Sequence, residues 1–249
     1  MAESVEVIDD DSVRIIRMNR PEKKNALTQP MYASMTAALA DAGSNDAIRC
    51  IMFAGTPGAF SAGADISEFL ESAMTGALRP KTLEFLNALA RSGKPMVAAV
   101  GGLAVGIGTT MLFHCDHVVA STDAKFSTPF TRLGLIPEAA SSLLAPMRMG
   151  YARAFALLVM GRPLTATDAK EAGLVNTVVD PAIVDMTALQ AAREIASLPP
   201  GAVAVARQLM RSQTDSVIAQ IETEVAHFKE RLQSAEARAA FENFLARKK

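Results

Sequence analysis

The sequence predicts an α/β fold followed by a helical region. Short apolar runs rich in β-forming residues alternate with alanine-rich segments along the first part of the chain, as in strands packed against helices. Two of these runs open into turns of small residues that lead into helices, and beyond about Asp185 the apolar spacing is helical. We therefore place a core of strands and helices at residues 1–195 and a separate helical region at residues 196–249.

The predicted core begins with a β-hairpin and continues with strands and helices in alternation. The turn-forming residues 9–12 separate the first two apolar runs, and Gly43 ends the first helix. The predicted strands are residues 5–8, 13–18, 49–54, 96–100, 116–120, 125–127 and 175–179. The predicted core helices are residues 30–42, 65–70, 81–91 and a short apolar helix that ends near Phe113.

The helical region carries an apolar stripe. Val217, Ile221 and Val225 recur every four residues and so share one helix face. The stripe continues with Phe228, Leu232, Phe241, Phe244 and Leu245. Such a face packs either on the protein's own core or on a neighbouring subunit, and the sequence leaves both possibilities open.

The two turns of small residues cover residues 55–63 and 101–108, and each connects a strand to a helix. Glycine lets the backbone approach other atoms closely at such places. The first N–H groups of each following helix have no partner within that helix, so they can bind a negatively charged oxygen. Considered alone, the first turn is equally consistent with Asp65 as an ordinary helix cap. Two such turns that converge would bind one carbonyl oxygen.

Three better-known motifs fit these turns less well. The glycines at positions 102, 106 and 108 lack the G-x-G-x-x-G spacing of dinucleotide-binding proteins, and no Gly-Lys-Ser/Thr follows, as a P-loop requires. Residues 59–63 approximate the G-x-S-x-G elbow of hydrolases, with Ser61 as the nucleophile. The candidate bases for that alternative are His114, His117 and His227.

Composition excludes several kinds of partner. A chain of 249 residues with a formal net charge of −1 and a pI near 6.3 has no basic field to attract nucleic acid. No apolar run reaches the ~20 residues that span a bilayer, and the acidic N-terminus lacks the apolar centre of a signal peptide. Cys50 and Cys115 lie in apolar stretches and predict reduced thiols. We therefore expect a cytoplasmic protein.

The run His114-Cys115-Asp116-His117 contains residue types that bind metals. It spans the end of a predicted helix and the start of the next strand, so its side chains should diverge. We expect a structural role for this run and no metal site.

Three segments together resemble the crotonase, or enoyl-CoA hydratase/isomerase, superfamily of acyl-CoA enzymes. They are Arg-Pro-Glu-Lys-Lys-Asn-Ala-Leu at 20–27, Ala-Phe-Ser-Ala-Gly-Ala-Asp-Ile at 59–66 and Lys-Pro-Met-Val-Ala-Ala-Val-Gly-Gly at 94–102. Arg-Pro-Leu-Thr-Ala at 162–166 and Glu-Ala-Gly-Leu-Val at 171–175 extend the resemblance over nearly the whole chain. The resemblance implies a spiral core of repeated ββα units and a C-terminal helical region for trimerisation. It therefore implies a homotrimer or a dimer of trimers.

The resemblance also implies a site for an acyl-CoA substrate, with no other cofactor. By position, the N–H groups of Ala64 and Ile107 would hold the thioester oxygen, although the family usually has glycine at the second place. Loss of one such donor costs ~3 kcal/mol of transition-state stabilisation in other enzymes. The residues that the resemblance places beside coenzyme A are Lys23, Lys24, Ala26, Ala62, Asp65 and Ile66.

The choice of reaction depends on the carboxylates. Hydratases of this family use two glutamates, whose places are taken here by Thr110 and Phe130. Residues 128–142 are instead similar to the peroxisomal-type Δ3-Δ2-enoyl-CoA isomerases of fatty acid metabolism and their bacterial relatives, in which a glutamate at the place of Glu138 is the base. One carboxylate suffices for isomerisation, because it can remove a proton from carbon two and deliver it to carbon four.

Other interpretations remain. Glu138 considered alone is better explained as a glutamate at a helix N-terminus, stabilised by the helix dipole, and only the family pattern favours catalysis. The chain could also catalyse another crotonase reaction, such as hydration with Thr110 or another group positioning the water. A third possibility is a catalytically silent member of the family that binds coenzyme A or acts as a scaffold.

Overall fold

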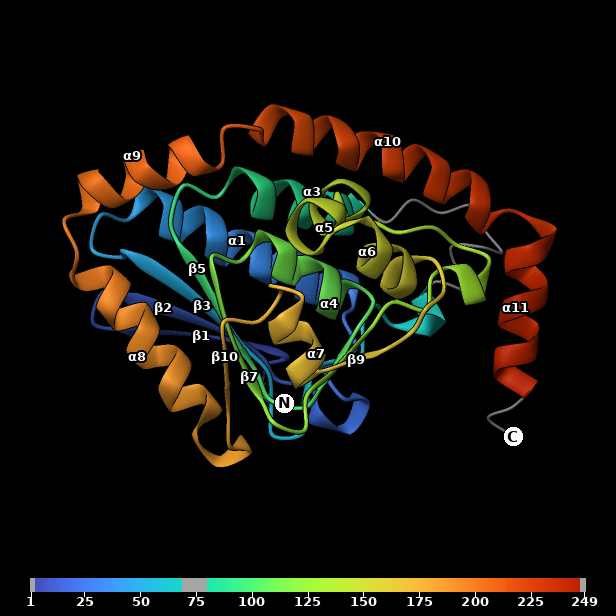
Figure 1. Ribbon diagram of the computed structural model, residues 1–249, viewed down its shortest axis with the longest axis horizontal. Helices are drawn as coiled ribbons and strands as arrows, with labels where there is room; N and C mark the ends of the chain where they lie inside the picture. Colours follow the sequence, from blue (N-terminus) through green and yellow to red (C-terminus); the bar gives the residue numbers. More distant parts are fainter. Residues whose placement is uncertain (1–2, 69–79, 247–249) are drawn as a thin grey trace.

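A computed structural model describes residues 3–68 and 80–246, with the backbone alone from residue 243 onward. The strands form two sheets (Figure 1), one in the order β1-β2-β3-β5-β7-β10 and one in the order β4-β6-β8-β9. Helices cover the sheets, and the C-terminal helices arch along the outside of the molecule (Figure 1). The described part of the chain is thus an α/β fold, as the sequence predicts.

The first sheet contains the long apolar strands. The predicted hairpin is confirmed, because β1 pairs with β2 in antiparallel fashion and the remaining strands are parallel. Every residue of β3 and β5 is buried, as expected for central parallel strands covered on both faces. The bounds are β1 Val5–Asp10, β2 Val13–Met18, β3 Cys50–Ala54, β5 Met96–Val100, β7 His117–Ser121 and β10 Thr177–Val179.

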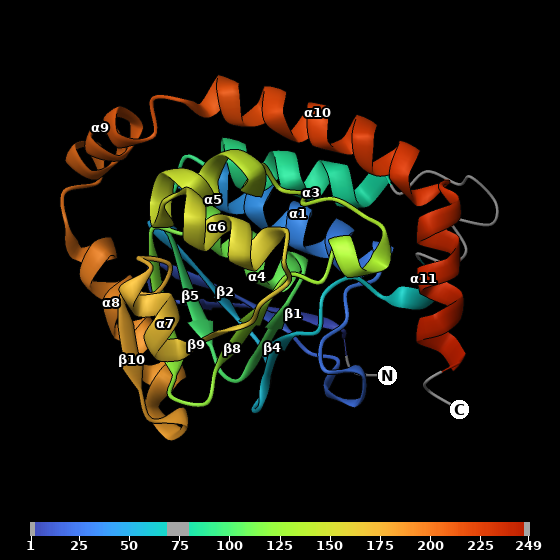
Figure 2. The same ribbon diagram turned by 45° about the vertical axis from the view of Figure 1, so that its right-hand side comes forward.

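The second sheet corrects the sequence prediction. The first turn was expected to lack regular structure and the second was predicted only as a turn, but each contains a short strand, and the two strands pair with each other in parallel. Figure 2 shows this smaller sheet beside the first one. Strands this short show no alternation that a sequence pattern could reveal. The bounds are β4 Ala59–Ser61, β6 Leu103–Val105, β8 Lys125–Ser127 and β9 Leu164–Thr165.

The two sheets grow together from a repeated unit. A strand of the first sheet is followed by a strand of the second sheet and then by a helix, first as β3, β4 and the helical residues 66–68, then as β5, β6 and α4 (Ile107–Thr110). The next unit adds β7 and β8 to the same two sheets. This succession confirms the predicted repeated ββα layout. The predicted continuation of the helix from residue 68 to 70 lies outside the described residues.

Helices bury both faces of the first sheet. On one face, α1 packs against α3, and Tyr32 and Phe53 both contact the ring of Phe85. On the other face, α8 places Ala188 and Ala192 against β3, β5 and β7. The bounds are α1 Gln29–Ser44, α3 Pro80–Arg91, α5 Ser141–Met149, α6 Tyr151–Leu158, α7 Ala166–Glu171 and α8 Val184–Ser197. Helix α8 therefore crosses the border that the sequence predicts between residues 195 and 196.

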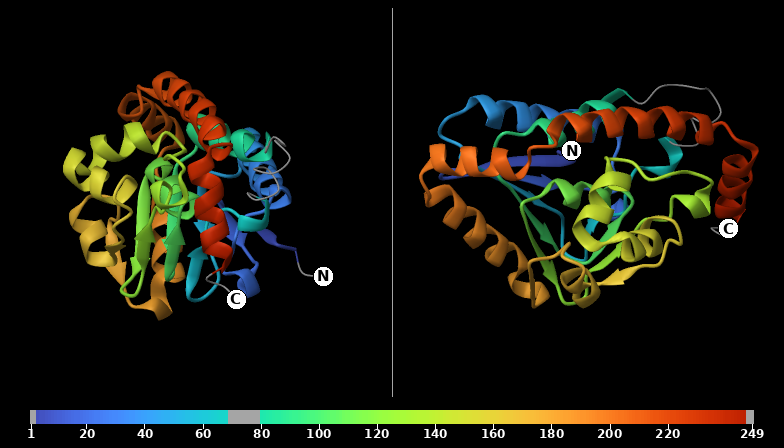
Figure 3. Two further views of the ribbon diagram at one scale, coloured as in Figure 1. Left: turned by 90° about the vertical axis from the view of Figure 1, so that its right-hand side faces the viewer. Right: turned by 45° about the horizontal axis from the view of Figure 1, so that its top comes forward.

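The remaining helices are α9 (Pro200–Met210), α10 (Thr214–Leu232) and α11 (Ala235–Ala246). Helix α10 lies against α3 and α5 of the same chain, and Val217 and Ile221 are buried in its core. Figure 3 shows α10 and α11 along the outer surface. The apolar stripe from residue 217 to 241 thus packs on its own chain. The side chains of Phe244 and Leu245 lie outside the described residues.

Both cysteines are free and buried, which confirms the prediction of core thiols. Burial raises the pKa of each thiol, that of Cys50 and that of Cys115, to about 12. Within residues 3–68 and 80–246, no helix combines the length and apolarity that a membrane crossing needs.

The close packing of the two glycine turns can be tested by substitution. Gly63 has φ of +89°, and a Cβ there would lie 2.8 Å from the carbonyl oxygen of Val105. We expect Gly63→Ala to lower the free energy of unfolding by about 1–3 kcal/mol, because a clash with backbone adds to an unfavourable φ. Chemical denaturation measures this change.

Gly43→Ala is the matched control. Gly43 is exposed within α1, and a Cβ there meets no atom within 4 Å. Alanine loses less backbone entropy in a helix, so this variant should be more stable by about 0.5–1 kcal/mol. Equal effects of the two substitutions would show that the turns are not closely packed.

Candidate active site

The two turns meet because the strands that lead into them are neighbours. Strands β4 and β6 run parallel with Ser61 beside Ala104, so both chains leave the small sheet at the same edge. The contact beyond that edge is close, since a Cβ on Gly108 would lie 2.8 Å from the carbonyl oxygen of Ser61. Only residues without a side chain fit at such a contact.

The first turn leaves one N–H group available. Residues 24–27 run alongside it, and the N–H groups of Ala62 and Asp65 donate to the carbonyl oxygens of Lys24 and Leu27 at 2.8 and 2.9 Å. Leu27 in return donates to the carbonyl oxygen of Gly63 at 2.8 Å. The N–H of Ala64 lies between these bonded groups, and it takes no part in them.

The second turn also leaves one N–H group available, that of Ile107. Gly106, with φ of 54° and ψ of −120°, donates its N–H to the carbonyl oxygen of Ser127 at 2.8 Å. Ile107 follows as the first residue of α4, where a helix N–H has no intrahelical acceptor. No atom of the described residues accepts a hydrogen bond from the N–H of Ala64 or Ile107. Both donors can therefore bind an oxygen of a ligand.

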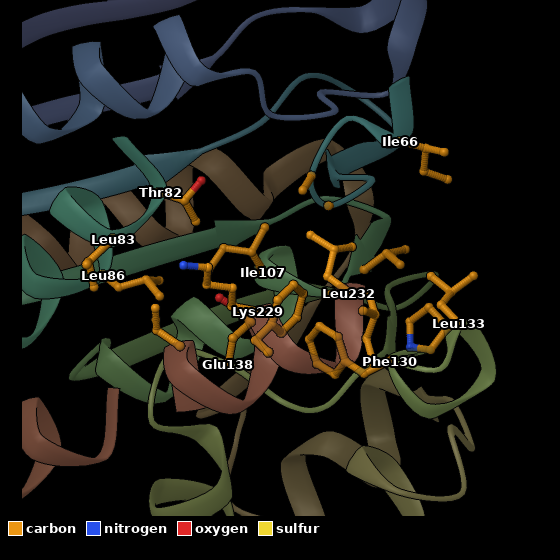
Figure 4. A pocket seen from close by; sticks show the side chains of 18 of the residues that line it. Ile66, Thr82, Leu83, Leu86, Ile107, Phe130, Leu133, Glu138, Lys229 and Leu232 are labelled. Atoms are coloured by element: carbon orange, nitrogen blue, oxygen red, sulfur yellow. The ribbon is translucent and has the colours of Figure 1, made fainter. Parts of the chain in front are cut away.

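A largely apolar cavity of about 220 Å³ lies beside these donors. Ala64, Ile107 and Glu138 all line it, and Figure 4 shows Glu138 among the surrounding apolar side chains. Helix α10 of the same chain forms one wall. The apolar side chains of the wall are Ile66, Leu83, Leu86, Phe130, Leu133, Leu135, Val225, Phe228 and Leu232. The cavity suits an apolar group attached to a polar carbonyl.

Glu138 lies in a loop ahead of α5, and its side chain is directed to the cavity. The buried hydroxyl of Thr110 donates to Glu138 Oε1 at 2.5 Å. Helix α5 begins only at Ser141, so the glutamate is not within the first turn of that helix. The hydrogen bond from Thr110 gives the carboxylate a partner outside that helix. Thr110, which the sequence marked only as a missing glutamate, orients the carboxylate.

The residues after Glu138 form a strained turn. Ala139 and Ala140 have φ of 64° and 53°, a left-handed conformation that residues with a side chain rarely adopt. Two adjacent residues of this kind cost roughly 1–2 kcal/mol each, so the surroundings must stabilise them. One stabilising group is His114, whose Nε2 donates to the carbonyl oxygen of Ala139 at 2.8 Å.

His114 is neutral in the folded protein. Its ring is completely buried, and burial lowers the pKa of the imidazole to about 4. Because a carbonyl oxygen only accepts hydrogen bonds, the Nε2 atom that faces Ala139 carries the proton. The prediction of a structural role for this histidine agrees with these contacts.

Glu224 of α10 is a buried carboxylate that the sequence analysis missed. It is 3% exposed and accepts hydrogen bonds from the N–H groups of Ala140 and Ser142 at 2.6 and 3.0 Å. Burial raises the pKa of Glu224 to about 7, while the bonds from Ser142 and Ala140 oppose that rise. A signal existed, because position 224 follows Val217 by two helical turns and so places a charge on the apolar stripe.

Two other sequence-based candidates are structural. Ser61 is fully buried, and its hydroxyl donates to the carbonyl oxygen of Asn25 at 2.8 Å, which argues against a hydrolase nucleophile. Among the described side chains, no group of three or more His, Cys, Asp or Glu is arranged to hold a metal ion.

A family model described as enoyl-CoA hydratase/isomerase matches residues 9–249. The chain belongs to the enoyl-CoA hydratase/isomerase family. It is 35% identical to enoyl-CoA delta isomerase 2 of Rattus norvegicus over 97% of its own length, and it spans 63% of that longer protein. It is 32% identical to the 1,2-epoxyphenylacetyl-CoA isomerase of Escherichia coli, with 96% of this chain and 94% of that protein covered.

A solved enoyl-CoA hydratase/isomerase from Pseudoalteromonas atlantica T6c superposes with a TM-score of 0.94 at 38% identity, covering 98% of both chains. The crotonase superfamily and its ββα fold, which the sequence motifs predict, are thereby confirmed. The relatives share acyl-CoA chemistry but are named for different reactions.

The residues that the family resemblance places beside coenzyme A are only partly gathered in this family member. Ala62 and Ile66 line the cavity. Lys23 ends the short 3-10 helix Pro21–Lys23 and Lys24 follows it. Both lysines are exposed, and neither lines the cavity. Their role and that of Ala26, which also lies outside the lining, stay predictions. The basic residues 247–249 lie outside the described part of the chain.

Asp65 has a structural partner of its own. Its carboxylate accepts a hydrogen bond from Arg20 at 2.6 Å, and this ion pair together with Ser67 lowers the pKa of Asp65 against the effect of burial. The N–H groups of Ala62 and Asp65 are already bonded within the protein. The main-chain groups through which these two residues could contact coenzyme A are therefore their carbonyl oxygens. Lys229 of α10, which does line the cavity, adds a cation that the sequence did not single out.

The neutral state of His114 predicts an acid-sensitive fold. Its pKa falls from 6.5 in the unfolded chain to about 4 in the folded protein, so its contribution to stability is complete above pH 6.5 and is lost as the pH falls toward 4. We expect wild type to lose roughly 2–3 kcal/mol more than His114→Gln between pH 7.5 and 4.5. Urea denaturation at the two pH values measures the difference.

The comparison between these two proteins removes the other titrating groups. The pKa of Glu224 is shifted in the opposite direction, but this residue is present in both proteins and cancels. The same loss of stability in both proteins would contradict a buried neutral His114.

Proposed function

We propose that this protein shifts the double bond of a 3-enoyl-CoA to give the 2-enoyl-CoA, with Glu138 as the single base. The observation that supports the proposal most directly is the composition of the cavity wall. Among the described residues that line the cavity, Glu138 is the only carboxylate, and two unused N–H groups lie on the same wall. One base and one oxyanion site are what this isomerisation requires.

The proposed reaction begins with the thioester oxygen on the N–H groups of Ala64 and Ile107. Glu138 removes a proton from carbon two, and the electron pair delocalises into the carbonyl to give a dienolate. The two N–H groups stabilise the negative oxygen as it develops. The protonated Glu138 then delivers the proton to carbon four, the double bond forms between carbons two and three, and the carboxylate is regenerated.

The surroundings of Glu138 favour this reaction over hydration. Hydration needs a group to position and deprotonate water as well as an acid for carbon two. At the two places where hydratases of the family have glutamates, Thr110 donates its hydroxyl to Glu138 and Phe130 presents an apolar ring to the cavity. Neither side chain can act as the base for water.

The reaction transfers a proton within one substrate and involves no change in oxidation state. The proposed enzyme therefore needs no cofactor beyond the coenzyme A that the substrate carries. In this proposal the apolar wall of the cavity receives the acyl chain, and Lys229 is the one cation among the described lining residues.

The role of Glu138 is tested with Glu138→Gln. Wild type should convert a 3-enoyl-CoA to the 2-enoyl product, and the variant should be slower by at least about 100-fold in kcat, because an amide cannot accept the proton. The rise in ultraviolet absorbance of the conjugated product follows the reaction.

The exposed Glu171→Gln serves as the matched control and should keep wild-type kcat. Undiminished turnover in Glu138→Gln would contradict the mechanism. Hydration of crotonyl-CoA is followed as loss of its ultraviolet absorbance. If wild type catalyses this hydration and no isomerisation, the hydratase alternative is favoured.

We also propose that the protein forms a homotrimer, or a dimer of trimers, as the sequence resemblance implies. Helix α9 is described in full and buries none of its residues within the single chain. Val205, Leu209 and Met210 on this helix are 57%, 73% and 88% exposed. Apolar side chains exposed together in this way mark a contact surface between proteins.

Leu209→Lys tests this assembly. Sedimentation should give the mass of a trimer or hexamer for wild type and a lower mass for the variant, because a charge at a subunit contact costs its hydration. Lys170→Ala, on the exposed surface of α7, should sediment as wild type does. A wild-type monomer at micromolar concentration would contradict the assembly.

A further inference from the structure

The loop that carries Glu138 has internal hydrogen bonds between the backbone of Glu138 and Ser141. The carbonyl oxygen of Glu138 accepts hydrogen bonds from the N–H and the hydroxyl of Ser141, at 3.2 and 2.6 Å. The backbone of Glu138 is therefore linked to the start of α5 through the left-handed residues Ala139 and Ala140. Any change in that turn moves the base.

The turn is held from two sides by groups that are distant in the sequence. His114 binds the carbonyl oxygen of Ala139, and Glu224 binds the N–H of Ala140. These two bonds hold the two ends of one peptide group, the carbonyl of Ala139 and the N–H of Ala140, and the Glu224 bond joins residues 84 positions apart. A left-handed pair of alanines persists only where such surroundings determine it.

Glu224 is the more specific of these partners. Its Oε2 accepts from Ala140, while its Oε1 accepts from both the N–H and the hydroxyl of Ser142, a hydroxyl that Gln220 also contacts at 2.9 Å. Two N–H groups and one hydroxyl thus donate to its two oxygens, and both oxygens act as acceptors. The residue comes from α10, the helix that also forms a wall of the cavity.

We propose that Glu224 is a positioning residue, which acts through the Ala139–Ala140 turn to direct Glu138 toward the substrate. This inference rests on the proposed function, in which Glu138 is the base. Glu224 does not line the cavity and is assigned no contact with substrate. Through it, the C-terminal helix sets the geometry of the base as well as the shape of the cavity.

Glu224→Gln tests the proposal with almost no change in size. The amide keeps one accepting oxygen and replaces the other with a donor, so either Ala140 or Ser142 loses its acceptor. A displacement of about 1 Å at a reacting group costs on the order of 100-fold in rate. We therefore expect kcat for the 3-enoyl-CoA to fall between about 10-fold and 100-fold, with KM unchanged, because the contacts with the ground-state substrate remain.

Two further measurements separate positioning from general loss of structure. Amide hydrogen exchange should become faster at Ala140 and Ser142 in the variant, with the sheet amides unaffected. Glu222→Gln, an exposed substitution two residues away on α10, should leave kcat, KM and exchange unchanged. Ser142→Ala, which removes one donor to Glu224 and keeps both N–H contacts, should lower kcat in the same sense but less, again with KM unchanged.

The proposal is overturned if Glu224→Gln keeps wild-type kcat, or if kcat falls only together with binding and sheet protection. If Glu224→Gln does not fold, wild-type kcat and exchange in Ser142→Ala overturn it. If the wild-type protein does not isomerise a 3-enoyl-CoA, the proposed function is refuted, but the role of Glu224 is not. In that case, incorporation of deuterium at carbon two of butanoyl-CoA in heavy water reports proton removal by Glu138, and an undiminished rate in Glu224→Gln then overturns the inference.

Discussion

The parallel pairing of β4 with β6 is the interaction on which the site depends. These short strands place the residues that follow them at one edge of the small sheet, where Gly63 and Gly108 allow the two backbones to touch. Only at that separation can an N–H from each turn reach one oxygen. The rest of the repeated ββα layout supports this pairing, because the long strands β3 and β5 that precede β4 and β6 are themselves parallel neighbours in the buried sheet.

Local hydrogen bonding decides which donors stay available. Ser61 Oγ accepts from the N–H before Ala64, Leu27 accepts from the one after it, and Ser127 accepts from the one before Ile107. The segment 20–27 therefore has a structural reason to resemble its family, since Arg20 and Asn25 hold the first turn in place. A motif that the resemblance links to coenzyme A thus also supports the turn that carries Ala64.

Burial has opposite effects on the two ionisable groups behind the Glu138 loop. It lowers the pKa of His114 and raises that of Glu224, because in both cases it disfavours the charged form. The histidine responds by remaining a neutral donor, whereas the glutamate receives donors that stabilise its carboxylate. Both groups contact the same strained turn, so their costs of burial are tied to the position of Glu138.

Local sequence patterns were sufficient for the hairpin, the long buried strands and most helices, because these elements are long enough to show their periodicity. The motifs were also sufficient for the family and for the candidates Ala64, Ile107 and Glu138. Strands β4, β6 and β9 were missed, because β4 and β6 lie within turns of small residues and β9 has only two residues, so all three depend on pairing with a neighbouring strand.

Only the tertiary structure decided which side chains meet. The contact of Thr110 with Glu138 and that of Glu224 with Ala140 join residues far apart in the chain. A local sequence pattern does not predict contacts between such distant residues. It also decided that the apolar stripe of α10 packs on its own core and closes the cavity. The sequence alone determined the family; the packing of α10 decided how the loop of Glu138 is held, because buried hydrogen bonds form only once the core has closed.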